Sequence, residues 1–310
     1  MKALIAPSYG PLEQLEIAEV PVPEPGPGQL LIRVGAAALN ALDAKLALGV
    51  MREIMPIEHP FVLGMDVAGV VTAAGADVTG FSVGDEVLAY TGFTAGTIAE
   101  YTVVDAGPQV VKRPAGLDVE RAAALSLAGI TAATIVHRAG PLDGRGLLVI
   151  GATGGVGSFV VQLAAHAGAE VLATAQPGDA EFVRDLGAAE VIDYTGTDTV
   201  AETRRLRPDG VDLAVDLVTM GPALAGTAAA VRDGGRILSP ISMPATFERG
   251  VTAEFVDMTA AEGRLARLAD EAANGGLVVE IGAKYPFGEA PLAVRDFAGK
   301  HTRGKIVLTF

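Results

Sequence analysis

Five apolar runs, which begin at Leu147, Val171, Val191, Val211 and Arg236, recur at intervals of 24, 20, 20 and 25 residues. Helical patterns of apolar residues fill most of the intervals. A strand, a helix and a second strand at this spacing are typical of the βαβ unit, whose strands are parallel. The middle of the chain is therefore predicted to form an α/β domain, a doubly wound parallel sheet covered by helices on both faces.

The first of these runs leads directly into a glycine-rich turn, after which an amphipathic helical pattern begins. Gly154 would let the backbone approach a pyrophosphate, and Gly157 would let helix and strand pack closely. The helix N-terminus would offer free N–H groups and the positive end of its dipole. The pattern predicts a dinucleotide site rather than an ordinary tight turn, formed by Gly151, Ala152, Thr153, Gly154, Gly155, Val156 and Gly157.

The second apolar run ends at Thr174, Ala175 and Gln176, where the adenosine ribose of such a cofactor would lie. An Asp or Glu at this place binds a free ribose 2′-hydroxyl, and it would repel a 2′-phosphate. The absence of that carboxylate favours NADPH over NADH. Asp179, a few residues further on, is the contrary feature.

The first third of the chain has a different pattern, in which short extended stretches alternate with turns. The proline-rich residues 21–28 exclude a helix at the entry to the first long stretch. A mostly antiparallel β domain is predicted, with strands near residues 30–34, 67–71, 86–90 and 100–104. Towards the C-terminus we expect a helix over 260–273 and then a return to β structure.

The composition of the chain excludes several classes of binding partner and of chemical site. The formal charge is −14 and there is no run of Lys or Arg, so nucleic acid and anionic membranes are poor partners and a small molecule is expected. Because the chain has no Cys, disulfides, thiolate zinc sites and cysteine nucleophiles are excluded. The four His residues share no metal-ligand spacing, so no metal site is predicted. We expect a soluble, cytoplasmic protein, since the uncharged residues 146–165 contain the glycine turn.

Several segments resemble a known family in their order and spacing. The chain resembles the zinc-independent quinone oxidoreductases of the medium-chain dehydrogenases/reductases, a group that includes ζ-crystallin. The resemblance covers nearly the whole chain. Besides the glycine turn, it rests on residues 40–45, 64–71, 81–87, 125–132, 211–216, 233–236 and 301–308.

The resemblance implies a GroES-like β-rich catalytic domain made from residues 1–117 and 262–310, and a Rossmann NADP-binding domain over 118–261. It further implies that NADPH binds in the cleft and that two copies form a homodimer. In the zinc alcohol dehydrogenases of this superfamily, a Cys and a Gly-His-Glu sequence supply zinc ligands. Here Asn40 stands near the first position and Gly64, Met65 and Asp66 stand at the second, so the catalytic zinc is not expected.

The resemblance also suggests roles for individual residues, each with a structural alternative. Asn40 would bind the substrate oxygen or the nicotinamide ribose, or would be a plain turn residue; Lys45 would act on the cofactor phosphate or an enolate, or would be a solvated helix residue. Thr131 would reach the cofactor or be a buried helix threonine. The remaining candidates for cofactor binding are Thr174, Tyr194, Arg303 and Lys305, whereas Asp66, Asp85 and Asp216 are expected to be structural.

Without zinc, reduction of a quinone or an α,β-unsaturated carbonyl is favoured over alcohol chemistry, because hydride addition gives a delocalised anion that hydrogen bonds can stabilise. The leading hypothesis is an NADPH-dependent quinone or enone reductase. Two alternatives stay open. One is an enoyl-thioester reductase of a biosynthetic pathway, and the other is a non-catalytic NADPH-binding sensor or structural protein.

Overall fold

The computed structural model describes residues 1–92, 95–257 and 263–310. The chain forms two compact units: unit 1 comprises Met1–Ala128 and Glu262–Phe310, and unit 2 comprises Gly129–Ala261. The first division falls inside helix α2 (Val119–Ala139) and not at 117/118, where the sequence suggested it, because this helix contributes to both units. The second expected boundary, at 261/262, lies outside the described residues.

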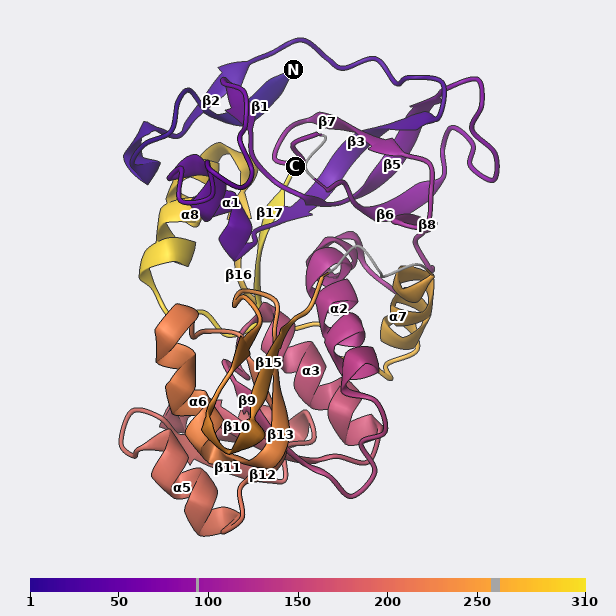
Figure 1. Cartoon of the computed structure of the whole chain (residues 1–310). Helices are drawn as coiled ribbons and strands as arrows, with labels where there is room; N and C mark the ends of the chain where they lie inside the picture. The colour runs from indigo at the N-terminus through magenta and orange to yellow at the C-terminus, as the bar shows by residue number, and fades with distance from the viewer. Residues whose placement is uncertain (93–94, 258–262) are drawn as a thin grey trace. The chain divides into compact units, whose positions relative to one another are not determined.

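Unit 2 is built on a seven-stranded sheet of order β11-β10-β9-β12-β13-β15-β14 (Figure 1). Neighbouring strands are parallel except β14, which pairs antiparallel with β15. The strands are β9 (Gly146–Ile150), β10 (Glu170–Ala175), β11 (Glu190–Asp193), β12 (Val211–Asp216), β13 (Val231–Ser239), β14 (Ala245–Thr246) and β15 (Thr252–Phe255). The helices are α3 (Gly155–His166), α4 (Ala180–Asp185), α5 (Thr199–Leu206) and α6 (Leu224–Ala230).

The predicted parallel sheet is confirmed, and its core explains the apolar runs. Leu148, Leu172, Ala214 and Ile237 come from four different strands and are fully buried in one cluster. Each of the five predicted runs lies in a strand, although β13 already begins at Val231. Because β9 and β10 are buried along nearly their whole length, their sequences are almost continuously apolar.

Unit 1 is rich in antiparallel strands, as the sequence predicts. One sheet has the order β2-β1-β4, and the other has the order β16-β17-β3-β5-β6-β8, with β7 also paired to β3. The strands are β1 (Lys2–Ala6), β2 (Glu16–Glu19), β3 (Gln29–Ala38), β4 (Phe61–Val62), β5 (Asp66–Ala74), β6 (Glu86–Tyr90), β7 (Tyr101–Asp105), β8 (Val110–Lys112), β16 (Ile281–Pro286) and β17 (Lys305–Thr309). The helices besides α2 are α1 (Ala41–Ala47), α7 (Arg264–Ala273) and α8 (Ala290–Gly299).

The C-terminal part of the chain joins the first third in this second sheet. The C-terminal strand β17 pairs antiparallel with β3, with Val307 opposite Ala38. The predicted helix over 260–273 is confirmed from Arg264 onward, and its earlier residues 260–262 lie outside the described residues. Helix α8 was not predicted, because Pro291 and the nearby glycines weaken its helical pattern.

Within the described ranges, α2 is the one helix that is long and apolar enough to cross a membrane. Of its most apolar stretch of 18 residues, 72% is buried inside the protein. Burial of this kind is typical of a core helix. The uncharged residues 146–165, whose length imitates a membrane span, fold instead as β9, the glycine turn and part of α3.

Candidate active site

The glycine turn connects β9 to α3 in unit 2, and its glycines differ in their surroundings. A Cβ atom added at Gly157 would lie 2.0 Å from the carbonyl oxygen of Gly151, so this glycine is required for close packing. At Gly154 the nearest atom would be 3.6 Å away, and the backbone φ is an ordinary −75°. Gly154 also precedes the first turn of α3, whose N–H groups have no partner within the helix. The open space beside Gly154 fits the close approach of a pyrophosphate.

This turn lies at the point where the strand order reverses, between β9 and β12. Ligands of doubly wound sheets bind at such points, outside the carboxyl ends of the strands. The turn after β12 lies against the glycine turn, since the Leu217 N–H donates to the Ile150 carbonyl at 3.2 Å. Asp216, at the end of β12, accepts hydrogen bonds from the Val218 and Thr219 N–H groups at 3.0 and 2.7 Å. These contacts agree with the structural role expected for Asp216, which stays a prediction.

Thr174 supports the glycine turn from the neighbouring strand. Its hydroxyl accepts a hydrogen bond from the Gly151 N–H at 3.1 Å and lies 3.4 Å from the Val149 carbonyl. The residue is only 3% exposed. This corrects the expectation that Thr174 contacts the cofactor phosphate, because the hydroxyl is buried and already bound to the backbone.

The first partly exposed side chain after Thr174 is Gln176, because Ala175 is fully buried. The Gln176 amide donates a hydrogen bond to the Tyr194 hydroxyl at 3.0 Å, and Tyr194 is 43% exposed. The tyrosine hydrogen is thereby left to donate to a ligand. Tyr194 is thus accessible to a ligand, and its contact with the 2′-phosphate stays a prediction. Gln176 was missed as a site residue, because its partner lies 18 positions away.

The other predicted cofactor contacts differ in accessibility. Ala152 and Thr153 are buried in the glycine turn. Thr131 is 2% exposed within α2, which agrees with its structural alternative. In unit 1, Arg303 forms an ion pair with Glu280 at 2.7 Å, and its side chain is 44% exposed.

Unit 1 contains a buried polar cluster around Lys305. The Lys305 ammonium donates to the Leu39 carbonyl at 2.7 Å and to Asn40 Oδ1 at 2.6 Å, and it lies 3.4 Å from Asp66 Oδ2. Its side chain is only 5% exposed. This corrects the expectation that Lys305 binds the cofactor, because all three ammonium hydrogens are directed at groups of the protein itself.

Asp66 and Asp43 are the two acidic residues of this cluster. Asp66 accepts hydrogen bonds from Asn40 Nδ2 at 2.9 Å and from the Leu127 N–H at 2.8 Å. Burial raises the pKa of Asp66, and Lys305 and these two donors oppose the rise. Asp43 accepts the Asn40 N–H at 2.7 Å, while its other oxygen, Oδ1, is buried without a partner among the described residues. Burial raises the pKa of Asp43 to about 7.

The two predicted catalytic residues are placed differently. Asn40 immediately precedes α1, is partly exposed and is held by the buried cluster. Lys45 lies in α1 and is also partly exposed, and its ammonium makes no hydrogen bond or ion pair with the part of the chain that the structure describes. Lys45 is thus accessible to a ligand, but its surroundings do not distinguish that role from a solvated lysine.

The positions compared with the zinc ligands hold no ligand set. Asn40 and Asp66 are hydrogen-bonded to each other and to Lys305. Across residues 1–92, 95–257 and 263–310, no group of three or more His, Asp or Glu side chains could hold a metal ion. Asp85 accepts the Ser82 N–H at 2.9 Å and pairs with Lys112, contacts that agree with the structural role expected for it.

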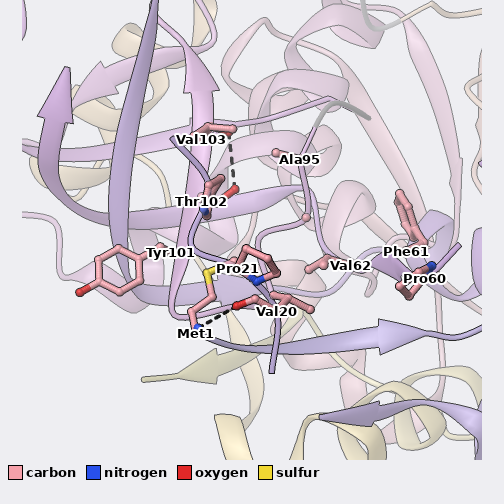
Figure 2. Close-up of a pocket in the computed structure, with 12 residues that line it drawn as sticks. Met1, Val20, Pro21, Pro60, Phe61, Val62, Ala95, Tyr101, Thr102 and Val103 are labelled. Carbon is pink, nitrogen blue, oxygen red and sulfur yellow. Dashed lines mark hydrogen bonds between the residues drawn. The ribbon is translucent and has the colours of Figure 1, made fainter. Parts of the chain in front are cut away.

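A surface pocket of about 440 Å³ lies elsewhere in unit 1 (Figure 2). Its lining is mainly apolar and includes Val20, Pro21, Phe61, Val62 and Val103. Figure 2 shows the N-terminal amine of Met1 bonded to the Val20 carbonyl at one side of it. None of the predicted site residues lines this pocket, so it is not the candidate active site.

Comparison with known proteins identifies the family. The family model for the alcohol dehydrogenase GroES-like domain matches residues 26–115, and that for the zinc-binding dehydrogenase matches residues 186–308. The chain is 33% identical to the NADPH-dependent alkenal/one oxidoreductase of Arabidopsis thaliana, over 99% of this chain and 79% of that protein. The chain belongs to the medium-chain dehydrogenase/reductase family.

Two further comparisons extend this result. The chain is 41% identical to the chloroplastic quinone-oxidoreductase QR1 of Triphysaria versicolor, over 58% of this chain and 56% of that protein. It spans 56 to 61% of the length of this protein and two other plant quinone-oxidoreductase relatives. Among solved structures, a mycobacterial protein complexed with NADPH is similar over the full length of both chains, with 29% identity and a TM-score of 0.88.

Proposed function

We propose that this medium-chain dehydrogenase/reductase is an NADPH-dependent oxidoreductase that reduces a quinone or an α,β-unsaturated carbonyl. The observation that carries the proposal is the open backbone at Gly154, which precedes α3 at the switch point of a doubly wound sheet. The similarity to quinone and alkenal/one oxidoreductases, and to a structure complexed with NADPH, supports the choice of substrate and cofactor.

The residues of unit 2 fit NADPH. The glycine turn and the free N–H groups of α3 would bind its pyrophosphate. Tyr194, oriented by Gln176, would donate a hydrogen bond to the 2′-phosphate. Asp179 is the last residue of the short helix Pro177–Asp179, and no carboxylate residue lies between the end of β10 and Asp179. When bound, NADPH supplies the hydride.

In unit 1, Asn40 is the residue best suited to act on the substrate. It is partly exposed, and one end of its amide is a hydrogen-bond donor. A donor stabilises the oxygen on which negative charge develops when a conjugated carbonyl or a quinone is reduced. Lys45 is accessible and would assist by charge.

We also propose that the reaction proceeds without zinc. The chain has no Cys, and the positions compared with zinc ligands carry Asn40, Met65 and Asp66. Asn40 and Asp66 are bound to a buried ammonium, which would repel a divalent cation. The reduced substrate would then be stabilised by the hydrogen bond from Asn40 and the charge of Lys45, without a metal ion.

The test is a substrate panel with the purified protein. Quinones, simple enones, enoyl thioesters and primary alcohols are each offered with NADPH or NADP⁺, and the nicotinamide absorbance is followed. The proposal predicts NADPH oxidation with quinones or enones. A clear preference for enoyl thioesters would establish the alternative reductase function, and NADPH binding without any turnover would favour a sensor.

Location and assembly are further proposals. By resemblance to the family we infer a cytoplasmic homodimer. Sedimentation of the purified protein tests the dimer, and fractionation of the source cells tests the compartment. A monomer, or a protein found in a membrane fraction, would contradict them.

A further inference from the structure

The side-chain amide of Asn40 lies between two buried groups of opposite charge. Its Oδ1 accepts a hydrogen bond from the Lys305 ammonium at 2.6 Å, and its Nδ2 donates to the Asp66 carboxylate at 2.9 Å. The side chains of Lys305 and Asp66 are 5% and 0% exposed. Asn40 itself is partly exposed.

These two neighbours determine which way the amide points. The oxygen and nitrogen ends of an amide have almost the same shape, so packing alone does not distinguish them. If the Asn40 amide were rotated by 180°, its NH₂ group would face the ammonium and its oxygen would face the carboxylate. Both contacts would be repulsive in a buried environment, where electrostatic interactions are strong.

Neither member of the charged pair can donate to a substrate, because the three Lys305 hydrogens are used within the protein and an ionised Asp66 only accepts. Lys305 also donates to the Leu39 carbonyl, and Asp66 also accepts the Leu127 N–H. Asn40 differs, because among the described residues the only further hydrogen-bond contact of its Nδ2 is with the Ala38 carbonyl at 3.5 Å. This distance is longer than a normal N–H···O hydrogen bond, so the second Nδ2 hydrogen is available as a donor.

We propose that Lys305 and Asp66 are positioning residues that fix the Asn40 amide so that its free N–H donates to the carbonyl oxygen of the substrate. This proposal rests on the proposed function. When hydride adds to the β-carbon of an enone, the electron pair of the C=C bond moves towards that oxygen and an enolate forms. A proton from water then adds to the α-carbon. A donor that is already oriented stabilises the developing negative charge without reorganisation.

The pair is tested with a double-mutant cycle. Asn40→Ala removes the donor, and Lys305→Met combined with Asp66→Asn removes both charges. Removing both partners avoids leaving one buried charge uncompensated. The matched control is Lys284→Met, the same substitution in the adjacent strand β16. Lys284 is an exposed lysine that pairs with Glu120.

We expect Asn40→Ala to lower kcat for an enone by about 100-fold, the effect of losing one donor to an oxyanion. The charge-free pair should lower kcat by about tenfold or more and change KM for NADPH by less than about threefold. In the Asn40→Ala background, removing the pair should cause no further loss, because the pair acts through Asn40. Lys284→Met should retain the unmodified kcat.

A second readout does not depend on turnover. The two side-chain N–H resonances of Asn40, identified by their loss in Asn40→Ala, should include one shifted and slowly exchanging proton bound to Asp66. Removal of the charged pair should abolish this signature in a protein that still unfolds cooperatively. If the double substitution does not fold, Asp66→Asn alone, which leaves the Lys305 ammonium on the Leu39 and Asn40 oxygens, is compared by the amide signature only, and loss of the shifted, slowly exchanging proton is expected.

The positioning role would be overturned if removal of the charged pair lowered kcat by the same factor in the unmodified protein and in Asn40→Ala. It would also be overturned if removal of the pair left the amide signature unchanged. The failure of the proposed function gives a different result. In that case the unmodified protein would reduce neither enones nor quinones, whatever the state of the Asn40 amide.

Discussion

Gly157 lies so close to the Gly151 carbonyl that no side chain fits between them. A Cβ atom at Gly157 would lie 2.0 Å from the Gly151 carbonyl oxygen, far inside van der Waals contact. The Gly154 position between them leaves open space for the same atom. One glycine of the turn therefore maintains the fold, and the other maintains room for a ligand.

This difference predicts opposite effects of two substitutions. Gly154→Val should weaken NADPH binding by about 100-fold or more, because its side chain would occupy the space of the pyrophosphate. The loss of stability should be only about 1 kcal/mol, since the backbone conformation is ordinary. Titration of NADPH fluorescence and urea unfolding measure the two quantities. Tight NADPH binding by Gly154→Val would place the cofactor elsewhere.

Gly157→Ala is the matched comparison in the same turn. Overpacking against the Gly151 backbone should lower the free energy of unfolding by about 3 kcal/mol. If Gly157→Ala were as stable as the unmodified protein, the close contact would not be present in solution.

Thr174→Val should destabilise the protein without changing its choice of cofactor. The substitution leaves the Gly151 N–H without its side-chain acceptor and should cost about 1–3 kcal/mol of unfolding free energy. Because the hydroxyl is buried, the ratio of kcat/KM for NADPH to that for NADH should stay the same. A large fall in that ratio, with stability retained, would restore the phosphate-binding role predicted from the sequence.

Cofactor choice should depend on the Gln176 and Tyr194 pair. A single charge-assisted hydrogen bond from Tyr194 predicts a preference of about tenfold for NADPH, which Tyr194→Phe should largely remove. Gln176→Asp should reverse the preference by repelling the 2′-phosphate and accepting the ribose hydroxyl. Gln176→Asn is the control without charge. If the unmodified protein uses NADH equally well, Asp179 is the residue to test next.

Asp43 should make stability depend on pH. Since its pKa is raised to about 7 in the folded state, the folded protein retains a proton that the unfolded chain loses above its ordinary pKa of about 4. Stability due to this group is therefore full below about pH 4 and is lost as pH rises towards about 7. Relative to Asp43→Asn, the unmodified protein should lose about 2–3 kcal/mol between about pH 5 and about pH 8. Urea unfolding measures the free energies. If the difference in unfolding free energy between the two proteins were the same at both pH values, this assignment would be contradicted.

The strands of unit 2 and the glycine turn were predictable, because local patterns determine them. Apolar runs at regular spacing define a parallel sheet, and the glycine turn occurs between a strand and a helix. Gly154 and Gly157 have the two different environments that the motif predicts. Helix α8 lacked such a pattern and was missed.

The side-chain partners in the candidate site were harder to predict. Lys305 contacts Asn40 and Asp66, which lie 265 and 239 positions away in the sequence. No local pattern indicates that a lysine at the start of the last strand is buried between them. For the same reason Thr174 was interpreted as a phosphate ligand, although its hydroxyl binds the Gly151 backbone.

The most direct test of the central claim follows the transferred hydrogen. The protein is dialysed against a chelator and then given an enone with NADPH that carries deuterium at the transferred position of the nicotinamide. The account predicts undiminished turnover and a saturated ketone with deuterium at the β-carbon. Deuterium at the carbonyl carbon of an allylic alcohol, or activity that is lost with the chelator and restored by Zn²⁺, would contradict it.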